Sequence, residues 1–359
     1  MPLHLDNHDV ARLVTPAGLA DALERAYRAY AAGEGVSPPR QDLQAAPAGA
    51  ATYQLGVAAG LSGRYGCLRI KSDLTYLVDG AQGRRKEKYC VEPGLYCGLI
   101  LLFSVDDGRP LAIVKDGCLQ QMRVAADSAI GARLMARPAA RTLGILGAGG
   151  MARAHLHAVG AATGVSRVCI YSPTEANRDA LAGLAESLGY ASRACASAEE
   201  VAAEADILCA CTNSPGPVVL GRDLRPGTHV TAIGGTLDEE ASARVDRWLR
   251  LGLATQAPEW GGAQVDEECL SFSASGSSAP SGGTRRFASI PLARRILLSE
   301  LLAAPGHGRQ SGAEITFSER GNIHGLQFAA AAGHLYERAV AAGAGRELPL
   351  DDLVQTVRN

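Results

Sequence analysis

The chain has 359 residues and a nearly balanced charge, with 35 lysines and arginines against 37 aspartates and glutamates. This length predicts about two domains, and the balance of charge argues against nucleic acid or a membrane surface as a partner. Because no apolar run approaches the roughly 20 residues of a membrane span and the start MPLHLDNHDV lacks a signal-peptide pattern, we expect a cytoplasmic protein.

The nine cysteines are scattered along the chain, which suits reduced thiols better than a disulfide framework. Cys209 and Cys211 alternate in the apolar run DILCACT and are interpreted as buried strand residues. Cys90 and Cys97 have no neighbouring cluster of histidine or cysteine. The sequence therefore predicts no metal site.

The first part of the chain predicts a mixed α/β region. Residues 16–32 have the apolar spacing of a helix. A Pro-rich turn then precedes Arg40 in an extended segment, and two β-like runs follow at residues 51–55 and 67–70, the second ending at Lys71.

Residues 72–94 are mostly polar and charged, which predicts a solvated loop rather than a phosphate site. The runs 98–104 and 110–114 flank an Asp-Gly turn and predict a β-hairpin. A helix is predicted from residue 119 to 136, because its apolar residues share one stripe and Pro138 follows.

A glycine-rich turn follows the apolar run of residues 142–146. Gly147, Gly149 and Ala152 have the spacing GxGxxA between a strand and a helix. In such a turn the first glycine permits the bend, the second admits a pyrophosphate, and the small third residue lets the helix pack closely. Together with Gly150 and Met151, these residues predict a dinucleotide-binding site at a helix N-terminus.

Beyond the turn, apolar runs at residues 168–171, 207–210 and 229–233 alternate with helical stretches, the rhythm of a doubly wound parallel sheet. The Ser- and Gly-rich residues 271–285 predict a mobile loop, either a lid or a plain surface insertion. The run 326–342 predicts a C-terminal helix that packs back on the first domain.

The end of the second strand bears on the choice of cofactor. NAD-preferring domains place a carboxylate there, whereas this chain continues from Tyr171 into Ser172 and Thr174 without one. Both residues and Arg178 are available to a 2′-phosphate, although Arg178 could equally be an ordinary helix-surface residue. We therefore predict NADP as the preferred cofactor over NAD.

Several blocks together resemble the ornithine cyclodeaminase and mu-crystallin family. They are Arg40 after a Pro-rich turn, Lys71 at a strand end, LQQMRVAADSAIGARLMA directly before TLGILGAGGMARAHL, then RPGTHVTAIGG and GRQSGAEITF. The resemblance implies a homodimer. It also implies a central Rossmann-type domain (residues 125–319) and a mixed α/β substrate and dimerisation domain built from both chain ends (1–124 and 320–359).

The resemblance further implies hydride exchange at the α-carbon of an amino or imino acid. Arg40 and Arg123 match the family's carboxylate clamp, and Lys71 matches its catalytic lysine, a residue able to act as acid or base. From the sequence alone each has a plain alternative: Arg40 in a solvated loop, Arg123 in a surface pair with Asp127, and Lys71 as a strand end. Arg69 lies close enough to Lys71 to leave a small alignment error open.

The chain departs from the cyclodeaminating members after IGG, where they carry an aspartate and this chain has Thr236. A hydroxyl cannot supply the charge of a carboxylate, so Thr236 at the substrate favours an imino acid reductase or amino acid dehydrogenase. Asp238 is a candidate catalytic substitute. Leu326 also stands near where relatives often have an aspartate. The alternatives are a deaminating cyclase and a crystallin-like protein that binds NADPH without turnover.

Overall fold

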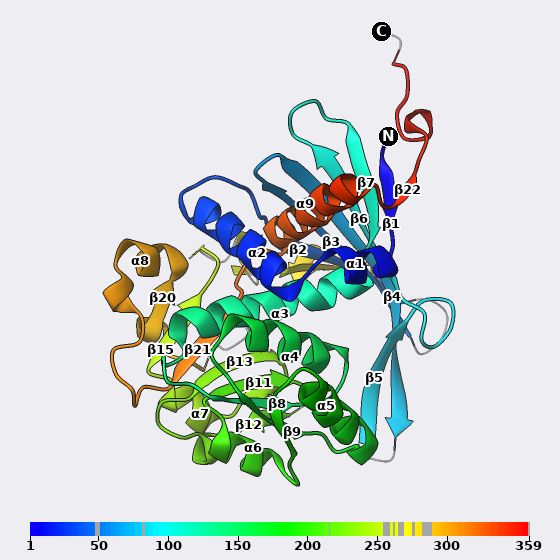
Figure 1. Ribbon diagram of the computed structural model, residues 1–359. Coiled ribbons are helices and arrows are strands. Elements are labelled where there is room, and N and C mark those ends of the chain that lie inside the picture. Colours follow the sequence, from blue (N-terminus) through cyan, green and yellow to red (C-terminus); the bar gives the residue numbers. More distant parts are fainter. Residues whose placement is uncertain are drawn as a thin grey trace.

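The computed structural model describes residues 1–46, 51–80, 83–214, 216–253, 259–260, 263–264, 269–274, 277–281 and 289–357. Two sheets form the molecule, with helix α3 running between them (Figure 1). The described α-helices are α1 (Asn7–Leu13), α2 (Pro16–Ala31), α3 (Asp116–Met135), α4 (Gly150–Ala162), α5 (Glu175–Ser187), α6 (Ala198–Glu204), α7 (Glu239–Arg244), α8 (Leu298–Ala303) and α9 (His324–Ala342).

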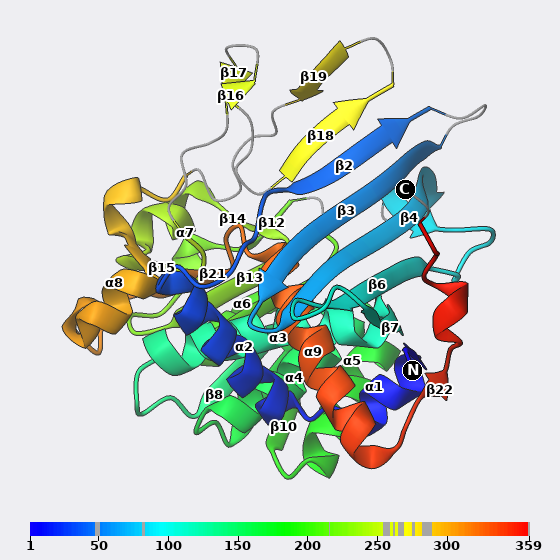
Figure 2. The same cartoon turned by 90° about the horizontal axis from the view of Figure 1, so that it is seen from above.

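The first sheet, sheet A, is mixed and joins both ends of the chain. Its strands follow the order β19-β18-β2-β3-β4-β6-β7-β1-β22, with β5 paired to β4, and they sweep across the molecule in Figure 2. Their bounds are β1 (Leu3–Leu5), β2 (Arg40–Ala45), β3 (Thr52–Ser62), β4 (Tyr65–Gly80), β5 (Gly83–Tyr89), β6 (Cys97–Ser104), β7 (Pro110–Lys115), β18 (Cys269–Ser273), β19 (Ser277–Ser281) and β22 (Arg346–Glu347).

The two faces of sheet A differ because side chains alternate along each strand. One cross-strand row is Ala58, Arg69, Ile100 and Val114, and all four are buried. Helices α2 and α9 lie on this side, and α9 packs on β3 and β4 (Figure 1). The sheet and these helices enclose one apolar core.

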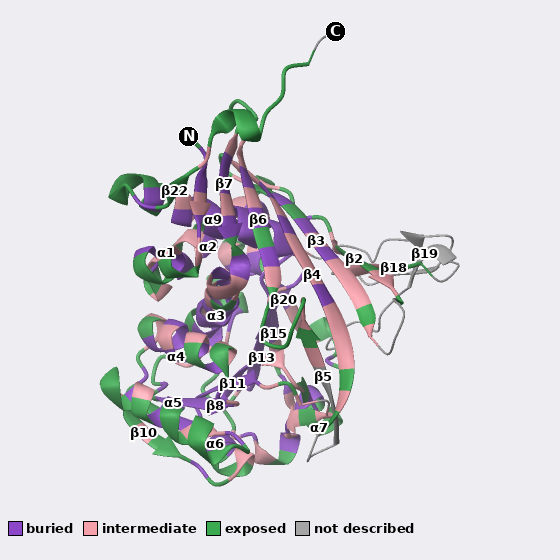
Figure 3. Ribbon diagram, turned by 90° about the vertical axis from the view of Figure 1, so that its right-hand side faces the viewer, coloured by how far each residue is buried: buried purple, intermediate pink, exposed green. Residues whose placement is uncertain are grey.

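The second sheet, sheet B, is entirely parallel in the order β10-β9-β8-β11-β13-β21-β15-β20. Its first five strands have the 3-2-1-4-5 order of a Rossmann fold. The central strands are buried along their whole length (Figure 3). The bounds are β8 (Thr142–Leu146), β9 (Arg167–Tyr171), β10 (Ala191–Ala194), β11 (Ile207–Cys211), β13 (His229–Gly234), β15 (Arg247–Arg250), β20 (Arg295–Leu297) and β21 (Thr316–Glu319).

Two short ribbons complete the described strands, β12 (Pro217–Val219) with β14 (Thr236–Leu237) and β16 (Glu259–Trp260) with β17 (Ala263–Gln264). The predicted fold class is confirmed. The hairpin of β6 and β7, helix α3, the Rossmann strands and the packing of α9 on sheet A all follow the predictions. Cys209 and Cys211 lie buried in β11.

The predicted loop at residues 72–94 is wrong. Strand β4 continues to Gly80 and pairs with β5 in an antiparallel ladder, in which Tyr76 stacks on Tyr89 with ring centroids 4.4 Å apart. Beyond Thr75, strand β4 pairs only with β5. These strand segments need no apolar alternation, so their polar sequence did not indicate a β-structure.

The predicted mobile loop at 271–285 is also wrong for most of its described residues. Residues 271–273 belong to β18, which pairs in parallel with β2, and residues 277–281 form β19. Edge strands are held by backbone hydrogen bonds, so a Ser-rich sequence is sufficient. Residues 275–276 and 282–285 lie outside the described residues. The domain boundaries at 124/125 and 319/320 stay predictions, although β18 and β19 fall in the second range and join sheet A.

Candidate active site

The glycine-rich turn lies where the strand order of sheet B reverses. Gly147 has a φ of +105°, which residues with a side chain rarely adopt. Its N–H donates to the Tyr171 carbonyl at 2.8 Å, and a Cβ placed on Gly147 would lie 2.4 Å from the Cys211 carbonyl oxygen. The bend therefore fits between the ends of β9 and β11, at the position where doubly wound folds bind dinucleotides.

The start of α4 is open for an anion. Gly149 is its N-cap, without a side-chain hydrogen bond to the first amides, and a Cβ placed on Gly149 would meet nothing within 4 Å. Ala152 is fully buried and lets the helix pack closely, while Met151 is half-buried. Free amides, a helix dipole and open space fit a pyrophosphate. These residues would hold a nicotinamide dinucleotide, which supplies or accepts hydride when bound.

Helix α3 connects this turn to sheet A. A Cβ placed on Gly150 would lie 2.6 Å from the side-chain nitrogen of Gln121, so α3 runs directly beside the start of α4. Further along α3, Ser128 hydrogen-bonds His155 of α4 at 2.9 Å and Thr231 of β13 at 3.0 Å. The helix is thus fixed to the Rossmann domain.

The residues predicted for a 2′-phosphate stand together after β9. Ser172 is buried, and Thr174 is the exposed N-cap of α5 with no side-chain capping bond. Arg178 forms long ion pairs to Glu175 at 3.7 Å and Asp179 at 3.6 Å. Both carboxylates are exposed and both distances are long, so these ion pairs are weak, and the guanidinium is available to a phosphate.

Alternate residues of β4 bring Arg69 and Lys71 to the face of sheet A that α9 covers. The neighbours of Lys71 across the sheet are Gly56 and Gly98, so no flanking side chain stands beside it. Its ammonium pairs with Asp73 and lies 5.3 Å from the centre of the Tyr96 ring. The Asp73 side chain is fully buried, and that of Lys71 is 20% exposed. The lysine is therefore held by a buried carboxylate at an accessible position.

Arg69 is held by hydrogen bonds within the protein and is not available to a substrate. Its Nε donates to Asp116 at 2.7 Å and its Nη2 to the Tyr96 hydroxyl at 2.9 Å. A Cβ on Gly98 would clash with the Asp116 carboxylate at 2.0 Å, so glycine is required there for this pair. Because Arg69 is committed in this way, Lys71 remains the better candidate for proton transfer.

Arg123 is buried, which excludes the surface-pair alternative. Its guanidinium lies 4.5 Å from the centre of the Phe328 ring and donates to the side-chain oxygens of Gln327 and Gln120. Burial, and then the charge of Arg320, lower the pKa of Arg123 to about 9. At neutral pH it is thus a buried cation whose hydrogen-bond partners are neutral amides, which suits the binding of a carboxylate.

The sequence did not reveal what positions Arg123. Gln327 of α9 donates through Nε2 to both oxygens of Asp127 at 2.6 Å. The hydroxyl of Tyr27 from α2 donates to the same carboxylate. Burial raises the pKa of Tyr27 well above its usual value, so it acts as a neutral donor. The only signal was one glutamine inside the apolar run of α9.

Arg40 is less free than predicted. Its Nη2 donates to Asp42 at 2.6 Å and to the Cys269 sulfur of β18 at 3.4 Å, and its side chain is 33% exposed. It lies in sheet A two positions before Asp42, whose cross-strand neighbour is Gly56 beside Lys71. Arg40 therefore borders the site, and its direct contact with substrate stays a prediction.

Two further basic residues were missed. Arg320 follows β21 at the carboxyl end of sheet B, and His324 begins α9. Burial, and then the charges of Arg320, Arg123, Arg40 and Arg69, hold the pKa of His324 well below its usual range. The charges of four guanidinium groups therefore act on one buried imidazole.

Leu326 does not face this group. It is fully buried, and a Cβ placed on Gly35 would lie 3.0 Å from its Cδ1 and 3.6 Å from the Tyr30 ring. The side chain therefore belongs to the core beneath α2. At the position near which the family resemblance places an aspartate in relatives, this chain thus has a leucine that packs in the core.

Thr236 and Asp238 lie on β14 and at the start of α7, away from the elements that carry Lys71 and Arg123. Thr236 is exposed on β14. Asp238 is the N-cap of α7, where its carboxylate accepts from the amides of Ala241 at 2.7 Å and Gly221 at 2.9 Å. This capping role favours a structural function, and a catalytic role for Asp238 stays an untested prediction.

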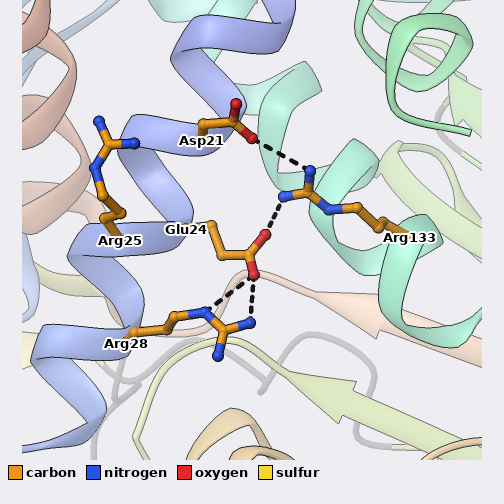
Figure 4. A pocket seen from close by; sticks show the side chains of 5 residues that line it. All are labelled: Asp21, Glu24, Arg25, Arg28 and Arg133. Atoms are coloured by element: carbon orange, nitrogen blue, oxygen red, sulfur yellow. Dashed lines mark hydrogen bonds and ion pairs between the residues drawn. The ribbon is translucent and has the colours of Figure 1, made fainter.

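A separate pocket of about 330 Å³ between α2 and α3 is a surface ion-pair cluster (Figure 4). There Glu24 pairs with Arg28 and Arg133, and Asp21 pairs with Arg133 at 3.3 Å, while Arg25 points away from them. Among the described residues, no cluster of three or more histidine, cysteine and acidic side chains is arranged to hold a metal. None of the helices described is long and apolar enough to cross a membrane.

A Rossmann sheet with an open glycine turn, joined by one helix to a group of basic side chains that includes a lysine, defines the class of dinucleotide-dependent oxidoreductases. The profile of the ornithine cyclodeaminase/mu-crystallin family matches residues 82–339. The chain belongs to this family.

Similarity to individual relatives agrees with that assignment. A Delta(1)-pyrroline-2-carboxylate reductase of Paracoccus denitrificans is 39% identical over 140 residues, which cover 38% of this chain and 44% of the relative. A reductase of the same name from Bacillus cereus is 28% identical over 258 residues, covering 70% of this chain and 74% of the relative. The solved Thermococcus litoralis reductase with NADH and L-proline has a TM-score of 0.73 at 22% identity, covering 96% of this chain and all of that one.

Proposed function

We propose that this protein is an NAD(P)-dependent imino acid reductase, which converts an α-imino acid to the α-amino acid or catalyses the reverse dehydrogenation. The supporting observation is the placement of Arg123 on α3. The same helix contacts the dinucleotide turn through Gln121, so a carboxylate on Arg123 is held at a defined distance from the cofactor site. The reductase relatives of the same family add to this support.

The chemistry divides between two cations. Arg123 binds the α-carboxylate, with Gln327 fixing its orientation. A nicotinamide dinucleotide would supply the hydride for the imine carbon when bound, and the imine nitrogen would take one proton, so that the C=N bond would become a CH–NH bond. Lys71 delivers that proton from Nζ, and the buried Asp73 holds the ammonium in place. A positioned acid of this kind contributes typically about 10²–10⁴-fold.

Cyclising deamination needs a carboxylate at the distal amine of the substrate. Thr236 offers only a hydroxyl, and Asp238 is engaged as a helix cap. The guanidinium groups whose charges act on His324 would also repel a second ammonium. The site therefore favours reduction.

We further propose NADPH as the preferred cofactor. Strand β9 ends at Tyr171 without the carboxylate that NAD-preferring domains place there, and Arg178 has only long ion pairs, to Glu175 at 3.7 Å and Asp179 at 3.6 Å. A 2′-phosphate would find a cation there, with no carboxylate at the end of the strand itself.

The homodimer is also part of this proposal. On the face of sheet A opposite to α9, the cross-strand neighbours are largely apolar and incompletely buried, and Leu99 is 36% exposed. Pairing of this face with a second copy would cover it. The apolar members of this face are Val57, Leu68, Ile70, Leu99, Leu101 and Ile113.

All nine cysteines are free, which suits a reducing compartment such as the cytoplasm.

The deciding experiment follows nicotinamide absorbance while the protein is incubated with NADPH or NADH and cyclic imino acids, or 2-oxo acids with ammonia. Oxidation of the cofactor that depends on the imine is expected. The Arg123→Met variant serves as the matched control and should lose it. Ammonia release from ornithine without cofactor oxidation would instead indicate a cyclodeaminase, and cofactor binding without any turnover would indicate a binding protein.

A further inference from the structure

Tyr96 lies beside Lys71, directly before strand β6. The Lys71 ammonium is 5.3 Å from the centre of the Tyr96 ring, and the tyrosine is 43% exposed. The proposed function uses the lysine and leaves the tyrosine without a role. Because Tyr96 is this open and this close to Lys71, it can contact a molecule that is bound at the lysine.

The Tyr96 hydroxyl is held by a buried ion pair. It accepts a hydrogen bond from Nη2 of Arg69 at 2.9 Å, and Nε of Arg69 donates to Asp116 at 2.7 Å. Both members of this pair are buried, and the absence of a side chain at Gly98 makes room for the Asp116 carboxylate. The hydroxyl oxygen is therefore fixed in position from the protein side.

The proton of this hydroxyl is free to bind a ligand. A phenol has one O–H donor beside its acceptor lone pairs. In the described part of the chain, the bond from Arg69 is the only hydrogen bond that Tyr96 forms. Burial raises the pKa of Tyr96 to about 12, against the opposing effect of the Arg69 charge, so the proton stays on the oxygen at neutral pH. Since a hydrogen bond accepted from a cation polarises the hydroxyl, Tyr96 offers a strong donor beside Lys71.

The partner of this donor follows from the chemistry of an α-imino acid. Once its nitrogen is protonated it has no lone pair there, and the acceptors that every such substrate retains are its two carboxylate oxygens. The carboxylate is bonded to the carbon of the C=N bond, so an imine nitrogen at Lys71 brings the carboxylate close to the same lysine. Phe328 relates this place to the clamp, because its ring centre lies 5.2 Å from the guanidinium carbon of Arg69 and 4.5 Å from that of Arg123.

We propose that Tyr96 is a substrate-binding residue, whose O–H donates to one oxygen of the α-carboxylate while Arg123 binds the other oxygen and Lys71 serves the nitrogen. This inference rests on the proposed reductase function and adds a third substrate contact to it. Arg69 acts through Tyr96 as a positioning residue. The carboxylate takes no part in the reaction, so the bond is equally strong in the ground state and the transition state. Its loss should therefore raise KM and leave kcat nearly unchanged.

The test removes the hydroxyl and keeps the ring. Tyr96→Phe should raise KM for the imino acid roughly 10- to 100-fold, the usual effect of losing a hydrogen bond to a charged group. Its kcat should change less than about threefold, and its pH–rate profile, NADPH affinity and Tm should match the wild type. Tyr53→Phe is the matched control, because the Tyr53 hydroxyl bonds Ser72 at 3.1 Å on the opposite face of β4 from Lys71. This variant should leave KM and kcat unchanged.

Equilibrium binding provides a readout without turnover. With NADP⁺ present, L-alanine, L-proline and L-glutamate are compared by thermal shift, and the Kd is measured for the one that raises the Tm most. Tyr96→Phe should weaken this binding by the same factor as it raises KM.

Three results would overturn the proposal. The first is an unchanged KM together with an unchanged Kd. The second is a loss of kcat with a shifted pH–rate profile at unchanged KM, which would assign the hydroxyl to proton transfer. The third is weakened NADPH binding or a lowered Tm, which would assign Tyr96 to the cofactor or the fold. If the wild type reduces no imine, the reductase function is contradicted and the Kd comparison alone decides the role of Tyr96, while a lack of binding by all three amino acids would contradict this proposal as well.

Discussion

Replacement of Lys71 by arginine separates proton transfer from charge. A guanidinium keeps the positive charge beside Asp73 but does not release a proton near neutral pH. Lys71→Met removes both the charge and the proton. The buried Asp73 side chain would then lose its cation, and because Lys71 is partly exposed we expect the lower end of the usual cost, about 3 kcal/mol of folding free energy.

The expected results therefore differ between the two variants. Lys71→Arg should lose at least about 100-fold in turnover, as the removal of a general acid does, with the Tm nearly unchanged. Lys71→Met should lose as much activity and also melt at a lower temperature. Both should bind NADPH normally, because the glycine turn lies on sheet B. Stopped-flow cofactor oxidation, thermal melts and cofactor titration measure these three properties.

One outcome would refute the assignment. If Lys71→Arg retained turnover within about tenfold, less than a general acid contributes, the proton would come from another group. Asp238 and a water relay would be the next to test. Loss of cofactor affinity together with activity would mean that Lys71 supports the structure of the site.

Three further results are expected. Gly147→Ala should lower stability by about 1–3 kcal/mol because of its positive φ. Gly149→Val should lower the Tm only slightly, through the poorer N-cap, and weaken dinucleotide binding by at least about tenfold, since it obstructs the anion site; melts and titrations distinguish the two variants. Arg178→Ala should reduce the preference for NADPH over NADH by about tenfold, as the loss of a phosphate contact does. An unchanged ratio of the two cofactor affinities would exclude Arg178 as a ligand of the 2′-phosphate. Burial lowers the pKa of His155 to about 4 and of His229 to about 3. Below pH 6.5 these histidines therefore become protonated in the unfolded chain but stay neutral in the folded protein. Denaturant titrations should show the free energy of unfolding falling below pH 6.5 by roughly 1.4 kcal/mol per pH unit for each histidine, and His155→Gln should make this pH dependence less steep.

The sequence predicted the elements whose residues bury a continuous apolar face. Strands β8 and β11 and helix α3 fall in this group, because a parallel sheet buried on both sides needs uninterrupted apolar runs. The hairpin of β4 and β5 and the strands β18 and β19 were missed, since backbone pairing at an edge leaves no mark on the side-chain pattern.

The site shows the same division. Gly147 and Gly149 could be found because a bend and an open helix start depend on local sequence. The group of Arg123, Gln327 and Asp127 could not, because Gln327 is separated from Arg123 by 204 residues in the chain. Arg320 has no local pattern at all, and only the fold lets its charge act on Arg123.

Helix α3 has a consequence for any attempt to redesign this protein. It carries Arg123, the proposed carboxylate clamp, and Gln121, which abuts the proposed cofactor turn, two residues apart in a single rigid element. The spacing between the two ligands is thus built into one element and does not depend on how the two sheets are oriented. Variants that accept longer substrates should therefore arise on β4, on α9 or at the end of β21, while changes in α3 should alter every substrate alike.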